Sequence, residues 1–151
     1  MTGRRPGGDR GSALVEFTYL GVLLMVPLVY LLLAVFQVQS AAFAVTEASR
    51  QAGRAFVRAD NAVDGHARAA QAVRLALADQ GITAAVPPTV SCDPEPCDLT
   101  AGQRVETAVA YTVPLPIVGG LFGPGRGGIA VSGRHVEVVD RFRRQPAGAA
   151  P

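Results

Sequence analysis

The feature that most constrains this chain is an uncharged apolar run near its start. No charged residue occurs from Phe17 to Thr46, and Leu, Val, Phe, Tyr, Ala and Gly dominate from Phe17 to Val38. As an α-helix these 22 residues extend about 33 Å, enough to cross the hydrocarbon core of a bilayer. A buried helix of a soluble core is the alternative, but it would carry polar residues on one face, and the segment LGVLLMVPLVYLLLAVF within this run shows none on any face. The sequence therefore predicts one transmembrane helix, which Pro27 kinks without breaking.

The residues before the run predict the direction of insertion. The segment MTGRRPGGDRG holds three arginines and one aspartate. By the positive-inside rule this N-terminal segment stays in the cytoplasm and the rest of the chain lies outside. A secretory signal peptide is the competing interpretation, and Ser40–Ala42 is a weak cleavage site for it. Its apolar part is usually only about 7 to 15 residues long, however.

Glu16 lies where the basic segment meets the apolar run. An unpaired carboxylate at the centre of a bilayer costs about 2.5 to 3.5 kcal/mol. Such a group either has a partner or stays among the lipid headgroups, where it also complements the positive end of the helix. The residue type alone leaves both roles open.

The junction around Glu16 resembles the processing site of type IV pilin-like proteins. Those proteins have a short basic leader, a Gly, and then an apolar helix whose fifth residue is Glu. The resemblance implies that a prepilin peptidase cuts after Gly11, so that residues 1–11 are a cytoplasmic leader and the mature chain begins at Ser12. Glu16 is then the fifth mature residue, followed by Phe17. In the family's assemblies the Glu16 carboxylate would pair with the Ser12 amine of an adjacent subunit.

Among pilin-like proteins, the chain is most similar to the TadE family of tight-adherence (Flp) pilus systems. The segment GSALVEFTYLGVLLMVPLVYLLLAVFQ carries the junction and a central Pro, and EASRQAGRAF follows it as an Ala/Arg/Gly segment beyond the membrane. The acidic residue usual after the first Arg of that segment is replaced by Gln51. The resemblance covers about the first 58 residues. It implies a structural minor pilin or pseudopilin whose partners are membrane lipid, prepilin peptidase, other pilin-like subunits and the pilus assembly machinery.

Beyond the membrane run the helix is expected to continue, so that residues 12–58 form one transmembrane and stalk helix. This stretch is rich in Ala and has no Pro after Pro27, which favours an unbroken helix. Two stripes at helical spacing make it amphipathic. The polar stripe consists of Glu47, Arg50, Arg54 and Arg58, and the apolar stripe consists of Val45, Ala48, Ala52 and Phe56.

The rest of the chain predicts a small α+β head over residues 59–140 with a flexible tail at 141–151. A second, amphipathic helix is expected from His66 to Gln80, stopped by Gly81. Three extended runs follow and predict a small antiparallel sheet. They are Ile82 to Ser91, Arg104 to Val113, and Ile129 to Val139. The apolar residues of the last run change parity, which predicts a bulge or tight turn near Gly133.

Cys92 and Cys97 enclose four residues, Asp93-Pro94-Glu95-Pro96. On an exported domain this spacing favours a small disulfide loop over a metal site, because only nearby carboxylates could complete the ligands. We therefore expect a disulfide, no metal and no cofactor.

Composition and motifs argue against catalysis and nucleic-acid binding. The net charge is +2, and the 14 basic residues, all Arg, are dispersed, whereas nucleic-acid binding needs clustered cations. His66 and His135 lie in no recognisable catalytic motif, and Gly119-Gly120 is not followed by Lys and Ser or Thr as a phosphate loop requires. Two rivals remain, an uncleaved single-pass anchor for a binding or sensor domain and a secreted enzyme with a long signal peptide. The mature N-terminus distinguishes all three.

Overall fold

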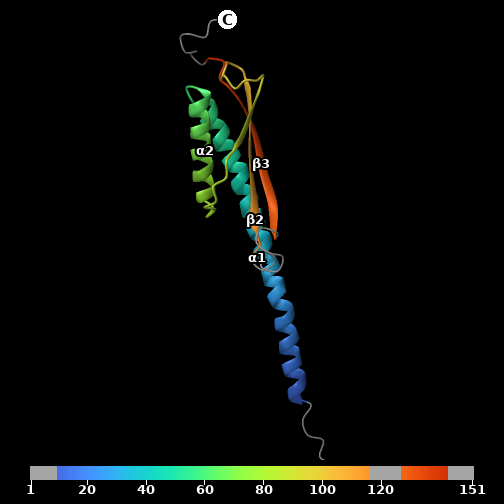
Figure 1. Ribbon diagram of the computed structural model, residues 1–151. Coiled ribbons are helices and arrows are strands. Elements are labelled where there is room, and N and C mark those ends of the chain that lie inside the picture. The colour runs from blue at the N-terminus through green and yellow to red at the C-terminus, as the bar shows by residue number, and fades with distance from the viewer. Residues whose placement is uncertain (1–9, 116–126, 143–151) are drawn as a thin grey trace, which may run out of the picture. The chain divides into compact units, whose positions relative to one another are not determined.

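The computed structural model describes residues 10–115 and 127–142, with only the backbone described at 10–12. The elements in chain order are α1 (Arg10–Val57), α2 (Ala62–Ala78), β1 (Thr89–Asp93), β2 (Arg104–Pro114) and β3 (Gly128–Val138) (Figure 1). This confirms the α+β class. Most of the predicted leader, the middle of the Pro/Gly-rich segment between β2 and β3, and most of the predicted flexible tail lie outside the described residues.

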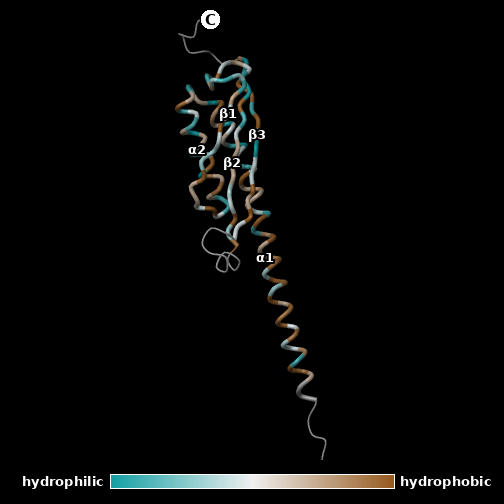
Figure 2. The backbone as a smooth tube through the Cα atoms, turned by 45° about the vertical axis from the view of Figure 1, so that its right-hand side comes forward, coloured by the Kyte–Doolittle hydropathy of each residue, from teal (hydrophilic) through white to brown (hydrophobic). Residues whose placement is uncertain are grey.

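The chain divides into two compact units, and the division falls within α1 after Phe36. The first part of α1 continues through Pro27 as one helix. Leu, Val, Phe and Met side chains are exposed around this part, which is brown over much of its length in Figure 2. Within the described residues α1 is the one helix that is long and apolar enough to cross a membrane.

From Gln37 onward, α1 belongs to the head and has a buried face. The predicted apolar stripe is fully buried, and the four residues of the predicted polar stripe are exposed. The buried positions recur every three or four residues, the spacing of one helix face. The apolar ones among them are Ala41, Ala44, Val45, Ala48, Ala52 and Phe56.

Helix α2 begins four residues before the predicted start at His66. The cause is an N-cap, because the Asn61 side chain accepts a hydrogen bond from the Asp64 N–H at 2.9 Å and so satisfies a free helix donor. Gly81, the predicted stop, has a φ of +74° just after the helix. The buried face of α2 packs into the head core, and His66 meets the Phe56 ring of α1 edge-on at 5.0 Å between centroids.

The three strands form an antiparallel sheet in the order β1-β2-β3. The inner side chains of β2 alternate with outer ones, and the head core lies between this inner face and the two helices. The predicted strand from Ile82 to Ser91 is mostly wrong, since β1 begins only at Thr89. Pro87 and Pro88 have no N–H to donate to a neighbouring strand, so pairing starts after them.

The bulge predicted near Gly133 is also wrong. Strands β2 and β3 pair in one unbroken register from Arg104↔Val138 to Pro114↔Gly128. Gly133 instead lets the strand approach α1, because a Cβ atom there would lie 2.5 Å from the Val45 carbonyl oxygen. The apolar residues of this run change parity because Val136 and Val138 face outward, where they are 46% and 49% exposed.

Candidate functional site

The first turns of α1 contain the predicted processing and assembly residues. Since α1 begins at Arg10, Gly11 and Ser12 lie in its first turn. Glu16 is exposed one turn later and makes no hydrogen bond or ion pair with the described residues. Phe17 beside it is 76% exposed. The structure therefore places the four residues on one continuous helical segment.

Glu16 is chemically isolated on this segment. Its neighbours Leu14 and Val15 are exposed apolar side chains, and no other charged residue follows until Glu47. A carboxylate is an acceptor-only group, and in a low-dielectric environment it requires a donor or a cation. The helix can thus offer one anionic site within an apolar surface.

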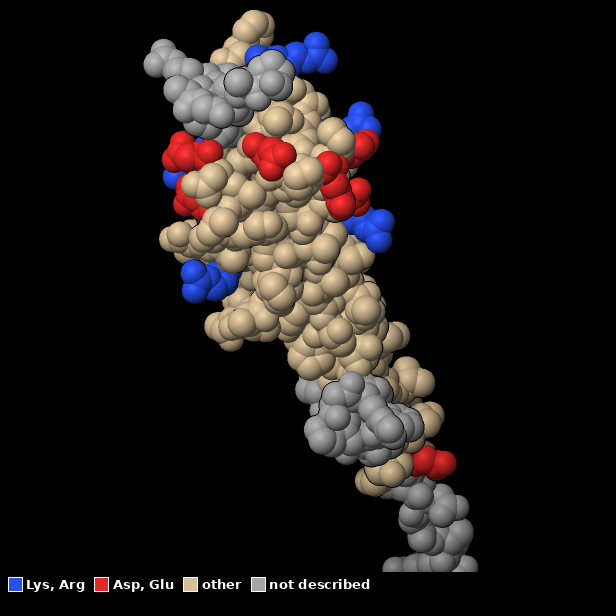
Figure 3. Space-filling view, turned by 45° about the horizontal axis from the view of Figure 1, so that its top comes forward, with Lys and Arg blue, Asp and Glu red and all other residues tan. Residues whose placement is uncertain are grey.

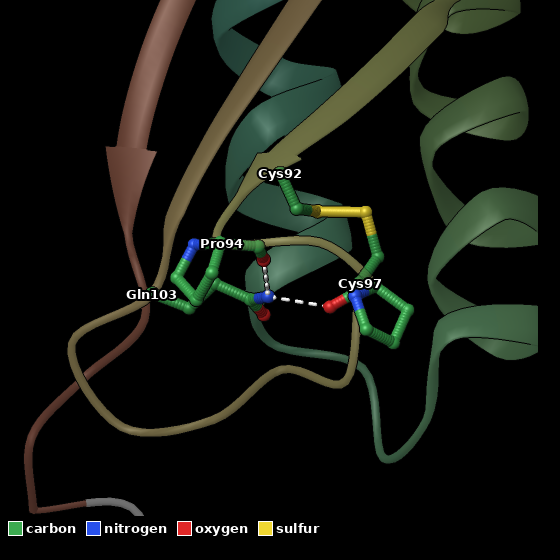
Figure 4. Close-up of a disulfide and its surroundings, with 5 residues drawn as sticks. Cys92, Pro94, Cys97 and Gln103 are labelled. Carbon is green, nitrogen blue, oxygen red and sulfur yellow. Dashed lines mark hydrogen bonds between the residues drawn. A yellow bond between two sulfur atoms is a disulfide. The ribbon is translucent and has the colours of Figure 1, made fainter.

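The second site is the loop closed by Cys92 and Cys97. These cysteines form a disulfide with their Cα atoms 5.3 Å apart, as the sequence predicts (Figure 4). Cys92 lies in β1 and joins the head core. The disulfide therefore ties the loop directly to the edge of the sheet.

The buried side chain of Gln103 holds the same loop, a role that the sequence did not predict. Its side-chain Nε2 donates to the carbonyl oxygens of Pro94 and Pro96 at 2.6 and 2.7 Å (Figure 4). Gln103 is only 3% exposed, and its Oε1 has no hydrogen-bond partner among the residues that the structure describes. The sole sequence signal is its position directly before β2. Two proline carbonyls cannot donate, so the amide N–H groups are matched to them.

Three polar side chains, Arg54, His135 and Glu137, connect α1 to the inner face of the sheet. The Glu137 carboxylate lies 3.1 Å from His135 Nε2 and 3.6 Å from Arg54 Nε. Arg54 is more than half exposed, so its ion pair is weak. Among the described residues no group of three or more His, Cys, Asp or Glu side chains could hold a metal ion. The contacts of Arg54, His135 and Glu137 are therefore suited to positioning α1 on the sheet.

The remaining surface offers a groove between α1 and α2 with a volume of about 720 Å³. Phe43 and Leu75 line it as exposed apolar side chains, with Arg50 and Asp79 among the charged ones. On the face of the head shown in Figure 3, acidic and basic side chains are interspersed. This face therefore carries no patch of one sign that would attract a polyanion.

Fold and site together define a chain with a long apolar helix, compatible with a single-pass membrane anchor, followed by a small disulfide-bonded α+β head. Comparison with protein-family models, curated proteins and solved structures gives no match. The function proposed below therefore rests on the residues of this chain.

Proposed function

We propose that this protein is a structural TadE-like minor pilin or pseudopilin. A prepilin peptidase cuts it after Gly11, and the processed subunit joins a tight-adherence-type pilus or secretion apparatus. Before assembly, the apolar part of α1 holds the subunit in the cytoplasmic membrane with the N-terminus inside and the head outside. In the assembly, neighbouring helices bury this apolar surface against one another. The role is architectural and uses no cofactor.

The spacing from Gly11 to Glu16 carries the proposal. It sets a single carboxylate at the fifth mature position of a helix whose surrounding side chains are exposed and apolar. A helix that served as the core of a soluble domain would have these side chains covered. Exposed Leu, Val and Phe side chains in such number instead favour lipid or other helices as their neighbours.

The disulfide supports the exported position of the head. Disulfides persist in oxidising compartments and are rare in the cytosol. A head closed by Cys92 and Cys97 therefore fits the side of the membrane opposite to the arginine-rich leader.

The test is the intact mass of the protein extracted from the membranes of its own host. The expected chain begins at Ser12. Gly11→Leu should block the cut, whereas Gly21→Ala, at a position where an added Cβ meets nothing within 4 Å, should leave it unchanged. A chain that begins at Met1 or Thr2 would indicate an uncleaved anchor, and one that begins beyond Ala42 would indicate a signal peptide. Either result would overturn the proposal.

A further inference from the structure

The two edges of the sheet differ in a way that the proposed function does not explain. Strand β1 has five residues, with Pro87 and Pro88 before it and Pro94 after it. Strand β3 has eleven residues, contains no Pro and pairs with β2 without interruption. In Figures 1 and 2 it forms the outer strand of the sheet, and no fourth strand is found in the described part of the chain.

The hydrogen bonds at both ends of β3 identify the groups on its free edge. The Leu115 N–H donates to the Gly127 carbonyl, and the Val139 N–H donates to the Gln103 carbonyl, each at 2.9 Å. Antiparallel pairing alternates with a period of two, so the odd-numbered residues of β3 bond to β2. The even-numbered residues direct their N–H and C=O groups away from the sheet. They are Gly128, Ala130, Ser132, Arg134, Val136 and Val138.

None of these six edge residues makes a hydrogen bond with the described residues. Proteins usually protect such an edge with Pro, a bulge, a short strand, charged side chains or a covering segment. Arg134 is the one charged side chain among the six, and it has no ion pair within the described ranges. Glu137 points to the inner face, where it meets Arg54, so it does not shield the edge.

We propose that β3 is a docking edge for an extended segment of a partner polypeptide, which adds to the sheet as a fourth strand. The backbone of the segment pairs with the six edge residues, as in other cases of strand addition. Its side chains include a carboxylate beside Arg134 and apolar groups beside Val136 and Val138, because cross-strand neighbours of these types stabilise a sheet. The partner segment is therefore an extended strand that carries both acidic and apolar side chains.

A second copy of this chain fits the edge less well, and this step rests on the proposed membrane topology. Strand β3 runs in the direction of α1, since Gly133 lies against Val45 and Glu137 lies beside Gly53. Antiparallel pairing of two β3 strands would point the two α1 helices in opposite directions. In parallel pairing about a two-fold axis, the neighbours of Arg134 would be Gly133 and His135 of the other copy. Arg134 would then have no carboxylate beside it.

Photo-cross-linking on the full chain in the membranes of its host tests the proposal. The probe is p-benzoylphenylalanine placed at Ser132 on the edge or, as a control, at Ala110. Ala110 is the register partner of Ser132 on the central strand and is also exposed. The expected product forms from Ser132, with a yield about tenfold above that from Ala110. Mass spectrometry should map it to an extended, acid-containing segment of another protein.

Two substitutions at Val136 test whether the free edge of β3, and not the sheet as a whole, binds the partner segment. Val136→Pro removes an outward N–H without removing a bond to β2, and Val136→Thr keeps that N–H. Val138→Lys adds a charge to the edge and serves if Val136→Pro does not fold. The Ser132 product should fall about tenfold in Val136→Pro and Val138→Lys and stay unchanged in Val136→Thr.

Four outcomes would overturn the proposal. They are no product from Ser132, equal yields from Ser132 and Ala110, a product between two copies of this chain, and a yield that neither edge variant lowers. The N-terminal mass of the same sample reports on processing after Gly11. A failure of strand docking is thus distinguishable from a failure of the proposed function.

Discussion

The hydroxyl of Thr107 on β2 donates a hydrogen bond to the backbone carbonyl of Ser49 on α1 at 2.8 Å, and both residues are fully buried. The hydroxyl of Ser49 in turn donates to the Thr46 carbonyl at 2.8 Å. A helix packed on a sheet usually presents apolar side chains to it. A buried polar contact such as this one forms only where the donor on the sheet faces its acceptor on the helix. It fixes which turn of α1 lies over the centre of β2.

Thr107→Val tests this contact. Valine keeps the shape of threonine and removes the donor, so we expect the free energy of unfolding to fall by about 1 kcal/mol. The Ser49 carbonyl lies within α1 and keeps its helical bond, which limits the loss. Chemical denaturation of the full chain in detergent, followed by circular dichroism, measures it. Thr112→Val on the exposed face of β2 is the matched control and should change stability little; equal losses would contradict the assigned role.

Gly133→Ala should be the most destabilising glycine substitution near α1. The added Cβ would lie 2.5 Å from the Val45 carbonyl oxygen and 2.7 Å from the Thr46 backbone, and helix backbone cannot yield locally. We expect a loss of about 3 kcal/mol or more. Gly53→Ala should cost less, because its Cβ would come no closer than 3.2 Å to any atom, and the atoms that it meets belong to side chains and not to backbone. The same denaturation experiment ranks the two, and a reversed order would refute the close approach of β3 to α1.

Sequence periodicity predicted the elements of the head that a single residue pattern determines. The buried stripe from Val45 to Phe56 was correct, because it follows from one side of the helix facing the core. The predicted start of α2 was four residues late, because the helix begins directly after the Asn61 N-cap and not with the apolar pattern. Boundaries set by one hydrogen bond are not visible in an apolar pattern.

Contacts between distant segments were beyond a single sequence. Gly133 was interpreted as a bulge, since a lone Gly in a strand indicates either a bulge or a close backbone approach. Only the position of Val45 across from it distinguishes these cases. The role of Gln103 was not predicted either, because its partners are proline carbonyls seven and nine residues earlier. The disulfide was predictable from the spacing of the two cysteines together with the expected export of the head.

Gln103→Glu should make the stability of the head depend on pH. The substitution places a carboxylate oxygen against the Pro94 and Pro96 carbonyl oxygens in a buried position. Burial and these dipoles raise the pKa of the introduced carboxyl above its usual value of about 4.3. The variant should therefore lose little stability below that pH, and progressively more as the pH rises through it, up to about 3 kcal/mol.

Unfolding free energies of the Gln103→Glu variant at several pH values measure this dependence. Gln71→Glu, at an exposed position of α2, is the control and should follow the parent chain closely. A flat pH profile for Gln103→Glu would show that the side chain is not enclosed by the loop.

The disulfide provides both a stability and a topology prediction. Replacing Cys92 and Cys97 with Ser together should lower the free energy of unfolding by about 2 kcal/mol, the value expected for so short a loop. In the parent chain taken from its host, non-reducing peptide mapping should show one linked peptide and no free thiol. Stoichiometric alkylation without reductant would place the head in the cytoplasm and reverse the proposed topology.

The last prediction separates the role of Glu16 from that of the leader. If Glu16 only rests among headgroups, Glu16→Gln should have almost no effect, since an interfacial charge contributes little. If it pairs with the Ser12 amine of a neighbour inside a low-dielectric helix bundle, the amide leaves that ammonium unpaired, which costs up to several kcal/mol. We therefore expect the variant to insert and to be cut after Gly11, yet to fail to assemble. Cross-linking between subunits and co-purification with the pilus machinery measure assembly, and Glu47→Gln on the exposed stripe of α1 is the control. Wild-type levels of both in processed Glu16→Gln would refute the assembly role of this carboxylate, because the cut itself would already be accounted for by Gly11.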